Sequence, residues 1–172
     1  MSIHPEHPFA TPEGLRDPIR RLRGRLAQPV SIWSVGELGA RPEGWTISSM
    51  LVAEGDPPEV IGLLDPDSDL ADLLGDADSE VRVCVTLLAE PQATVAEVFA
   101  RLAPSPGGPF RTGDWTDSPH GPRLDGAAGW LGVRLRRDAV TAGWSLLLRG
   151  TVESAELGPG VPLFHLRGAY RS

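Results

Sequence analysis

Short stretches of alternating apolar and polar residues recur along the chain, and each predicts a half-buried strand. The most regular one covers 45–52, where Trp45, Ile47, Ser49 and Leu51 fall on one side and the residues between them on the other. One face of this strand would therefore be unusually polar. Further strands are expected to begin at Val30 and to cover 59–64, 81–87, 130–136, 144–153 and 161–166.

Three segments have the helical period instead. The first has Asp17-Pro18 as N-cap and first helical position, and its apolar residues Ile19, Leu22 and Leu26 recur on one face until Gln28-Pro29. The second covers 68–74. The third is expected to open on a capping box at Thr94 and Glu97 and to run to Leu102.

Short strands with a few short helices in irregular order predict a mainly β protein, a β-barrel with peripheral helices. A regular strand–helix alternation, which a parallel doubly wound sheet would need, is not present. Glycine and proline number 20 and 17 of 172 residues, about twice the usual share, which fits many turns and a long loop at 104–122. The polar, proline-spaced residues 1–16 predict an N-terminal arm, and 17–172 a single domain.

The charged residues exclude several classes of function. The net charge is −7, so the chain on average repels a nucleic-acid backbone and no nucleic-acid partner is expected. All 16 basic residues are arginine, which rules out a lysine Schiff base and a P-loop lysine. The arginines at 16, 20, 21, 23 and 25 are interpreted as the solvated face of the first helix.

Metal and thiol chemistry are not expected either. Cys84 is the only cysteine and lies in an apolar run, which predicts a buried, inert thiol. The four histidines are scattered, and the aspartates from Asp65 to Asp72 lack the glycine and the terminal glutamate of a calcium loop. No apolar run is long enough to span a membrane, and the N-terminus has no apolar signal core, so we expect a cytoplasmic protein.

Three hydroxyl side chains fall within 46–49, and this segment is followed by a series of short motifs in a fixed order. The series resembles the flavin reductase-like, FMN-binding split-barrel family over roughly 18–171. Residues 43–50 are similar to its N-A-M-T-V-S-S-F strand, 56–58 to its D-P-P, 85–92 to its V-N-V-L…Q and 99–100 to its F-A. Trp115 with 121–124 resembles its W…G-x-P-x-L, and 150–152 with 162–170 its G-x-V…P-L-x-Y ending.

The resemblance implies a split β-barrel that holds FMN at a dimer interface. It places Trp45, Thr46 and Ile47 along the flavin ring, and it directs the hydroxyls of Ser48 and Ser49 towards the ring and the phosphate. It assigns Thr86 and Leu87 to a second flavin-lining stretch, Ser68 to the neighbourhood of the phosphate, and Trp115 and Ser145 to the nicotinamide side. No catalytic acid or base is expected, because hydride transfer belongs to the two cofactors.

Three positions depart from the family pattern. Thr86 stands where an asparagine is usual, and Gly143-Trp144-Ser145 stands in place of G-D-H, whose histidine is associated with nicotinamide binding. The segment around Ser68 is acidic where the family is basic, which predicts weak FMN binding.

The sequence therefore predicts an FMN-dependent (or FAD-dependent) NAD(P)H:flavin oxidoreductase that supplies reduced flavin to a partner monooxygenase. Two alternatives stay open: a flavin-binding electron-transfer protein without nicotinamide use, and a non-enzymatic split-barrel binding domain. A homodimer is expected, because a split barrel leaves open sheet edges. The aromatic residues that would supply its surface are Trp33, Trp45, Trp130 and Trp144.

Overall fold

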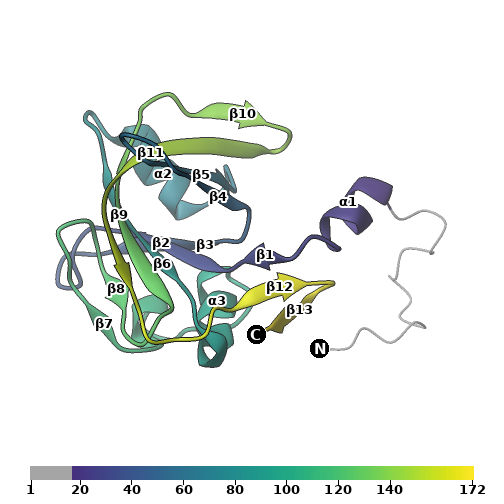
Figure 1. Ribbon diagram of the computed structural model, residues 1–172. Coiled ribbons are helices and arrows are strands. Elements are labelled where there is room, and N and C mark those ends of the chain that lie inside the picture. The colour runs from purple at the N-terminus through teal and green to yellow at the C-terminus, as the bar shows by residue number, and fades with distance from the viewer. Residues whose placement is uncertain (1–16) are drawn as a thin grey trace.

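A computed structural model describes residues 17–172; the expected N-terminal arm lies outside these residues. Its main element is an eight-stranded antiparallel sheet that curls into a partial barrel (Figure 1). The strand order is β3-β2-β6-β9-β11-β5-β4, with β10 added on β11. The bounds are β2 Ser31–Val35, β3 Glu43–Ile47, β4 Met50–Ala53, β5 Glu59–Leu64, β6 Arg82–Leu87, β9 Gly129–Leu135, β10 Val140–Ala142 and β11 Ser145–Leu157.

Within the described residues, two smaller sheets and five short helices accompany the main sheet, which confirms the expected mainly β class with peripheral helices. One sheet has the order β1-β12-β13 and the other joins β7 to β8. Their strands are β1 Gln28–Pro29, β7 Trp115–Thr116, β8 Arg123–Leu124, β12 Phe164–Leu166 and β13 Ala169–Arg171. The helices are α1 Pro18–Arg23, α2 Asp69–Asp76 and α3 Ala93–Phe99, with 3₁₀ turns η2 Glu90–Gln92 and η3 Pro109–Arg111.

The strand expected at 45–52 is two strands, and this is where the barrel is split. β3 pairs with β2 at one end of the sheet, whereas β4 pairs with β5 at the other. The chain crosses between these ends at Ser48 and Ser49, and the Ser49 carbonyl accepts a hydrogen bond from Leu63 N at 3.0 Å. The expected alternation therefore stops after Ile47, which is buried, and Leu51 is 70% exposed.

The first helix is shorter than its sequence pattern predicts. Asp17 caps α1 by accepting from Ile19 N, as expected, but the helix ends at Arg23 with Gly24 as C-cap. Ile19 and Leu22 are 70% and 60% exposed, and Leu26 lies beyond the helix. The reason is its position: α1 projects from the barrel, so its apolar face meets no core (Figure 1).

The third helix begins and ends elsewhere than predicted. Gln92 is the N-cap of α3, and Thr94 lies inside the helix. The preceding 3₁₀ turn sets this start, because the Gln92 Oε1 accepts a hydrogen bond from Ala89 N at 2.9 Å. The helix also ends at Phe99 rather than Leu102, which is 77% exposed.

Two apolar clusters form the core. The first fills the curled sheet around Trp33, which is fully buried and so supplies no surface, contrary to the expectation that it would. The second lies under α3 and is centred on Phe99. Cys84 is buried as expected, and burial raises the pKa of its thiol. Within 17–172, no helix has the length and apolarity needed to cross a membrane.

Candidate functional site

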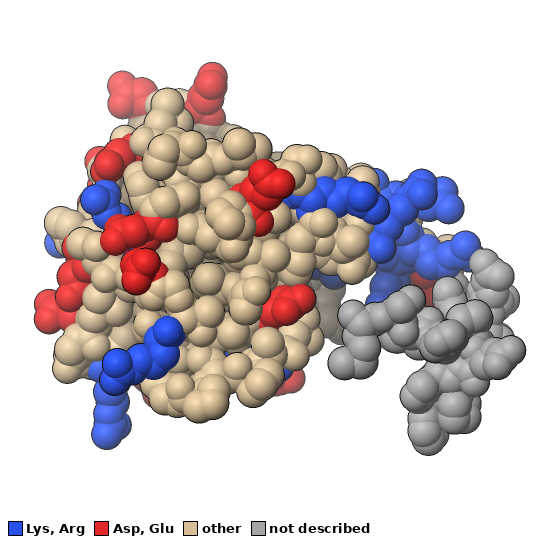
Figure 2. All heavy atoms as spheres, turned by 90° about the horizontal axis from the view of Figure 1, so that it is seen from below, with Lys and Arg blue, Asp and Glu red and all other residues tan. Residues whose placement is uncertain are grey.

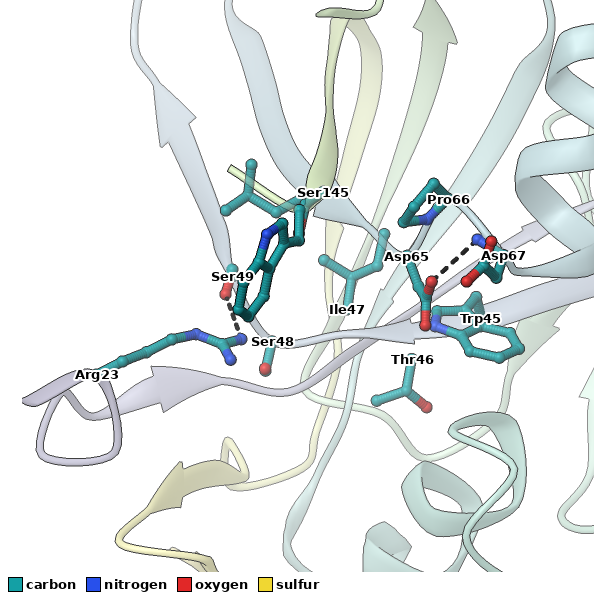
Figure 3. Close-up of a pocket in the computed structure, with 12 residues that line it drawn as sticks. Arg23, Trp45, Thr46, Ile47, Ser48, Ser49, Asp65, Pro66, Asp67 and Ser145 are labelled. Atoms are coloured by element: carbon teal, nitrogen blue, oxygen red, sulfur yellow. Dashed lines mark hydrogen bonds between the residues drawn. The ribbon is translucent and has the colours of Figure 1, made fainter. Parts of the chain in front are cut away.

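A pocket of about 410 Å³, open to solvent, lies at the split between β3 and β4 (Figure 3). This volume is in the range of small-molecule and cofactor sites. Four parts of the chain meet there: α1, the β3–β4 crossing, the segment from β5 to α2, and the turn between β10 and β11. The lining residues are Arg23, Trp45, Thr46, Ile47, Ser48, Ser49, Leu63, Asp65, Pro66, Asp67, Trp144 and Ser145.

β3 is the edge strand of the sheet, and this matters for the chemistry of the pocket. It pairs with β2 on one side, and no strand of residues 17–172 pairs with its other side. An edge strand leaves backbone N–H and C=O groups available on its open side. Its position is fixed from the core: Trp33 Nε1 donates to Ser31 Oγ at 3.1 Å, and Ser31 Oγ donates to the Ile47 carbonyl at 2.7 Å.

Polar donors gather where α1 approaches the β3–β4 crossing. The Arg23 guanidinium donates to Ser49 Oγ over 3.1 Å, and Gln28 Nε2 donates to the same oxygen over 3.4 Å. Ser48 Oγ donates to Gln28 Oε1 over 3.5 Å. Figure 3 shows Arg23 reaching toward Ser49 at this end of the pocket.

Carboxylates occupy the other end, beside Trp45 (Figure 3). Asp65 Oδ1 accepts a hydrogen bond from Asp67 N at 2.9 Å, which folds the loop before α2. Asp69, the first residue of α2, pairs with Arg101 at 2.6 Å. Nearby, partial burial raises the pKa of Glu43, and the Asp69 charge raises it further, while Arg101 opposes both.

The structure brings six of the residues expected from the sequence into one pocket. They are Trp45, Thr46, Ile47, Ser48, Ser49 and Ser145. The Thr46 hydroxyl is already engaged, because it donates to the Ala96 carbonyl at 2.7 Å. Ser48 Oγ also donates, to Gln28 Oε1, so within the expected segment the Ser49 hydroxyl hydrogen is the one that has no acceptor among residues 17–172.

Four other expected residues do not line this pocket. Ser68 is buried, donates to the Asp65 carbonyl at 2.7 Å and caps α2 by accepting from Ala71 N at 3.2 Å. Thr86 is fully buried in β6, between β2 and β9, and Leu87 follows it in the same strand.

Trp115 is the fourth of these residues, and it belongs to the second core cluster. Its ring centroid lies 5.2 Å from that of Phe99 and 4.9 Å from that of Phe110, and its Nε1 donates to the Thr112 carbonyl at 2.9 Å. The aromatic residues of the long loop thus pack over α3. Packing against the core therefore accounts for these aromatic residues, and no residue of the loop lines the pocket.

Four lining residues were missed by sequence reasoning: Arg23, Leu63, Pro66 and Trp144. Arg23 looked like one more solvated arginine of a helix. Trp144 is 95% exposed. Neither this exposure nor its place at the pocket follows from a local pattern, although Trp144 adjoins Ser145, which the family motif assigns to the site.

The profile of the flavin reductase like domain family matches residues 23–172. The chain belongs to this family. None of the curated proteins matches it significantly. The match covers the whole described barrel, including every element of the pocket except most of α1.

Solved structures are similar to this flavin reductase-like chain. The NADH:FAD oxidoreductase SgcE6 of Streptomyces globisporus, solved with NAD and FAD fragments, is 25% identical, with a TM-score of 0.78 and 90% of each chain covered. A Mycobacterium thermoresistibile homologue of nitrilotriacetate monooxygenase component B is 25% identical, with a TM-score of 0.76, covering 89% of this chain and 83% of the other.

A third structure is longer than this chain. It is a Sinorhizobium meliloti 1021 protein described as an oxidoreductase, 25% identical with a TM-score of 0.79. The match covers 92% of this chain but 54% of that one, so this chain spans about half the length of that protein.

The donor set of the pocket fits a flavin. A flavin has a flat aromatic ring with a polar edge and a hydroxylated chain ending in phosphate. Ile47, Leu63 and Trp144 offer apolar and aromatic surface, and Ser48, Ser49 and the open edge of β3 offer hydrogen-bonding groups. Within 17–172, there is no group of three or more His, Cys, Asp or Glu side chains that could hold a metal ion.

Proposed function

We propose that this protein is an NAD(P)H:flavin oxidoreductase that binds FMN or FAD at the split of its barrel. The observation that carries the proposal is the pocket itself. The Trp45–Ser49 segment and Ser145 come from distant parts of the sequence and line one pocket, in a chain that belongs to the flavin reductase-like family. A neighbour of 25% identity is an NADH:FAD oxidoreductase. This supports a flavin as the bound group and a nicotinamide nucleotide as the electron donor.

When bound, a flavin would supply the redox chemistry, as the acceptor of the hydride from a nicotinamide donor. The chain's own residues would bind the flavin, orient its ring and exclude water from it. Ile47 and Leu63 give the pocket an apolar floor, and Trp144 gives it an aromatic wall. Backbone N–H groups on the open side of β3 would be donors for the polar edge of a bound ring.

We further propose that reduced flavin passes to a partner monooxygenase. The Mycobacterium thermoresistibile neighbour is a homologue of a monooxygenase component, which supports this role. The pocket is open to solvent, so a flavin can leave without a large opening motion. We propose a cytoplasmic location, where the nicotinamide donors are available.

The functional unit that we propose is a homodimer. Support comes from apolar side chains left uncovered near the pocket: Ile19 and Leu22 on α1, and Leu51 and Val52 on β4, are all more than half exposed. β4 is also a sheet edge. Light scattering at micromolar concentration tests this, and a monodisperse monomer would contradict it.

The decisive experiment for the activity follows the oxidation of NADH and NADPH by the purified protein with added FMN or FAD. Oxidation well above the rate of free flavin is expected. The comparison variant is Trp144→Ala, which removes the exposed aromatic wall of the pocket without touching the core and should lower that rate at limiting flavin. If the wild type oxidises neither donor above background, the proposal is wrong.

Ser145 favours one alternative outcome of that experiment. It stands where the family has a histidine associated with nicotinamide, and it lines the pocket. If flavin binds and is reduced by dithionite or a protein donor but not by NADH or NADPH, the protein is a flavin-binding electron carrier. If the absorbance spectrum shows no bound flavin under any condition, the non-enzymatic binding domain remains.

A further inference from the structure

The charges of the pocket are separated along its length. Arg23 lies at the α1 end, and Asp65 and Asp67 lie at the end beside Trp45 (Figure 3). Ile47 and Ser48 lie between them. A ligand that carries an anionic group at one end and a neutral ring at the other is therefore favoured in one direction, because its anion is attracted at one end of the pocket and repelled at the other.

Arg23 is held in place by two kinds of contact. Its guanidinium donates to Ser49 Oγ, and the end of its helix is tied to the barrel because the Gly24 carbonyl accepts from Arg167 N at 2.6 Å. Arg167 belongs to the turn between β12 and β13. Among residues 17–172, Arg23 makes no ion pair, whereas Arg101 at the other end is paired with Asp69.

Ser49 adds a second donor at the same place. Its Oγ accepts from both Arg23 and Gln28, which uses its two acceptor positions. Its own hydroxyl hydrogen has no acceptor within the described part of the chain and is available for a ligand. A guanidinium and a hydroxyl that converge in this way suit a phosphate, which accepts several charge-assisted hydrogen bonds.

The start of α2 is the other place where an anion could bind, but the chain's own side chains already cap it. The Ser68 hydroxyl donates to the Asp65 carbonyl and caps Ala71 N. Asp69 and Asp72 place two carboxylates in the first turn of the helix. These groups satisfy and neutralise the helix end, so it offers little to a phosphate.

We propose that Arg23, together with Ser49, is the anion-binding element of the pocket and holds the phosphate of FMN or the pyrophosphate of FAD at the α1 end. This inference rests on the proposed function, and it places the phosphate away from Ser68. Other basic side chains gather on and after the same helix (Figure 2), but among the described residues Arg23 is the arginine that lines the pocket.

The test compares two flavins that differ in the phosphate. Dissociation constants for FMN and riboflavin are measured by fluorescence titration with wild type, Arg23→Gln and the control Arg21→Gln. Arg21 lies on the same helix, is exposed and does not line the pocket. We expect Arg23→Gln to weaken FMN binding about tenfold and riboflavin binding less than twofold, while Arg21→Gln changes either by less than twofold.

Two further measurements sharpen the result. Inorganic phosphate should compete with FMN in the wild type and lose most of this effect in Arg23→Gln. Arg23→Lys should recover part of the FMN affinity, because it keeps the charge and loses the planar fork. Thermal melting of each variant checks that the fold is intact.

The possible results distinguish a failure of the phosphate site at Arg23 from a failure of the proposed flavin-dependent function. If the wild type binds both flavins and Arg23→Gln changes both equally, or neither, the phosphate lies elsewhere and the inference is wrong. If the wild type binds neither FMN nor riboflavin, the proposed function is wrong and the inference fails with it. Selective loss of FMN affinity supports both.

Discussion

Gly62 of β5 lies against the indole ring of Trp33. A Cβ atom built on Gly62 would come within 2.7 Å of Trp33 Cζ2, closer than real side chains pack. The ring cannot retreat freely, because it is fully buried and its Nε1 donates to Ser31. Since Ser31 also holds the Ile47 carbonyl, this contact connects the core to the strand that lines the pocket.

Gly62→Ala should therefore destabilise the protein by about 1–3 kcal/mol, the usual cost of overpacking a core. Urea unfolding followed by tryptophan fluorescence measures the change. The control is Gly39→Ala, where an added Cβ meets nothing within 4 Å. Equal stability of the two variants would show that the sheet relaxes around Trp33 at little cost.

Ser68→Ala should act on stability and not on phosphate recognition. Loss of the cap should cost about 1 kcal/mol of folding free energy. The ratio of FMN to riboflavin affinity should stay as in the wild type, because the Ser68 hydroxyl is bonded within the chain. A selective loss of FMN affinity would instead restore Ser68 as a phosphate ligand.

Trp144→Ala should reduce flavin affinity about two- to tenfold, the effect of losing one aromatic contact. Its side chain is 95% exposed, so the free energy of unfolding should change by no more than about 0.5 kcal/mol. Equilibrium titration and thermal melting separate the two effects. Leu102→Ala, an exposed apolar residue that does not line the pocket, serves as the control and should leave flavin affinity unchanged.

Acid should remove part of the stability that Glu59 provides. A hydrogen bond from Arg149, at 2.7 Å, lowers the pKa of this carboxyl, helped by the charges of Arg149 and Arg136. A carboxyl with a lowered pKa stabilises the fold above its unfolded pKa and loses this contribution as the pH falls through its folded pKa.

Glu59→Gln should thus melt at a lower temperature than the wild type at pH 7, and the difference should shrink as the pH falls below about 4. Melting curves between pH 3 and pH 7 test this. Glu54→Gln on the same hairpin is the control, since Glu54 is exposed and has no ion pair among residues 17–172. A difference that persists unchanged at pH 3 would assign the effect to packing rather than charge.

Local patterns predicted the longer strands of the main sheet, but not the short strands β1, β7, β8, β10 and β13. Alternation located β5 and β6 almost to the residue. It could not reveal that 45–52 changes partner at Ser48, because both halves have strand character and the break depends on pairing with β2 and β5. The extent of α1 was also missed, because Leu26 continues its apolar period although the helix has ended.

The site was predictable where it follows one strand and hidden where it depends on distant segments. Trp45 to Ser49 could be assigned from consecutive residues. Arg23 and Trp144 reach the pocket only through the folding of α1 and the β10–β11 turn, which no local pattern encodes. Thr86 and Trp115 carried the right motifs, yet packing places one inside the sheet and the other over α3.

The pairing of β5 with β11 has a consequence for how the pocket comes into being. Glu59 and Arg149, which join these strands, are 90 residues apart in the chain. Closing so long a loop is entropically costly before any contact rewards it, and sheets of this kind fold in milliseconds to seconds. The pocket contains residues next to both strands, such as Asp65 after β5 and Ser145 at the start of β11. The protein therefore cannot bind flavin until most of its chain has left the ribosome and folded.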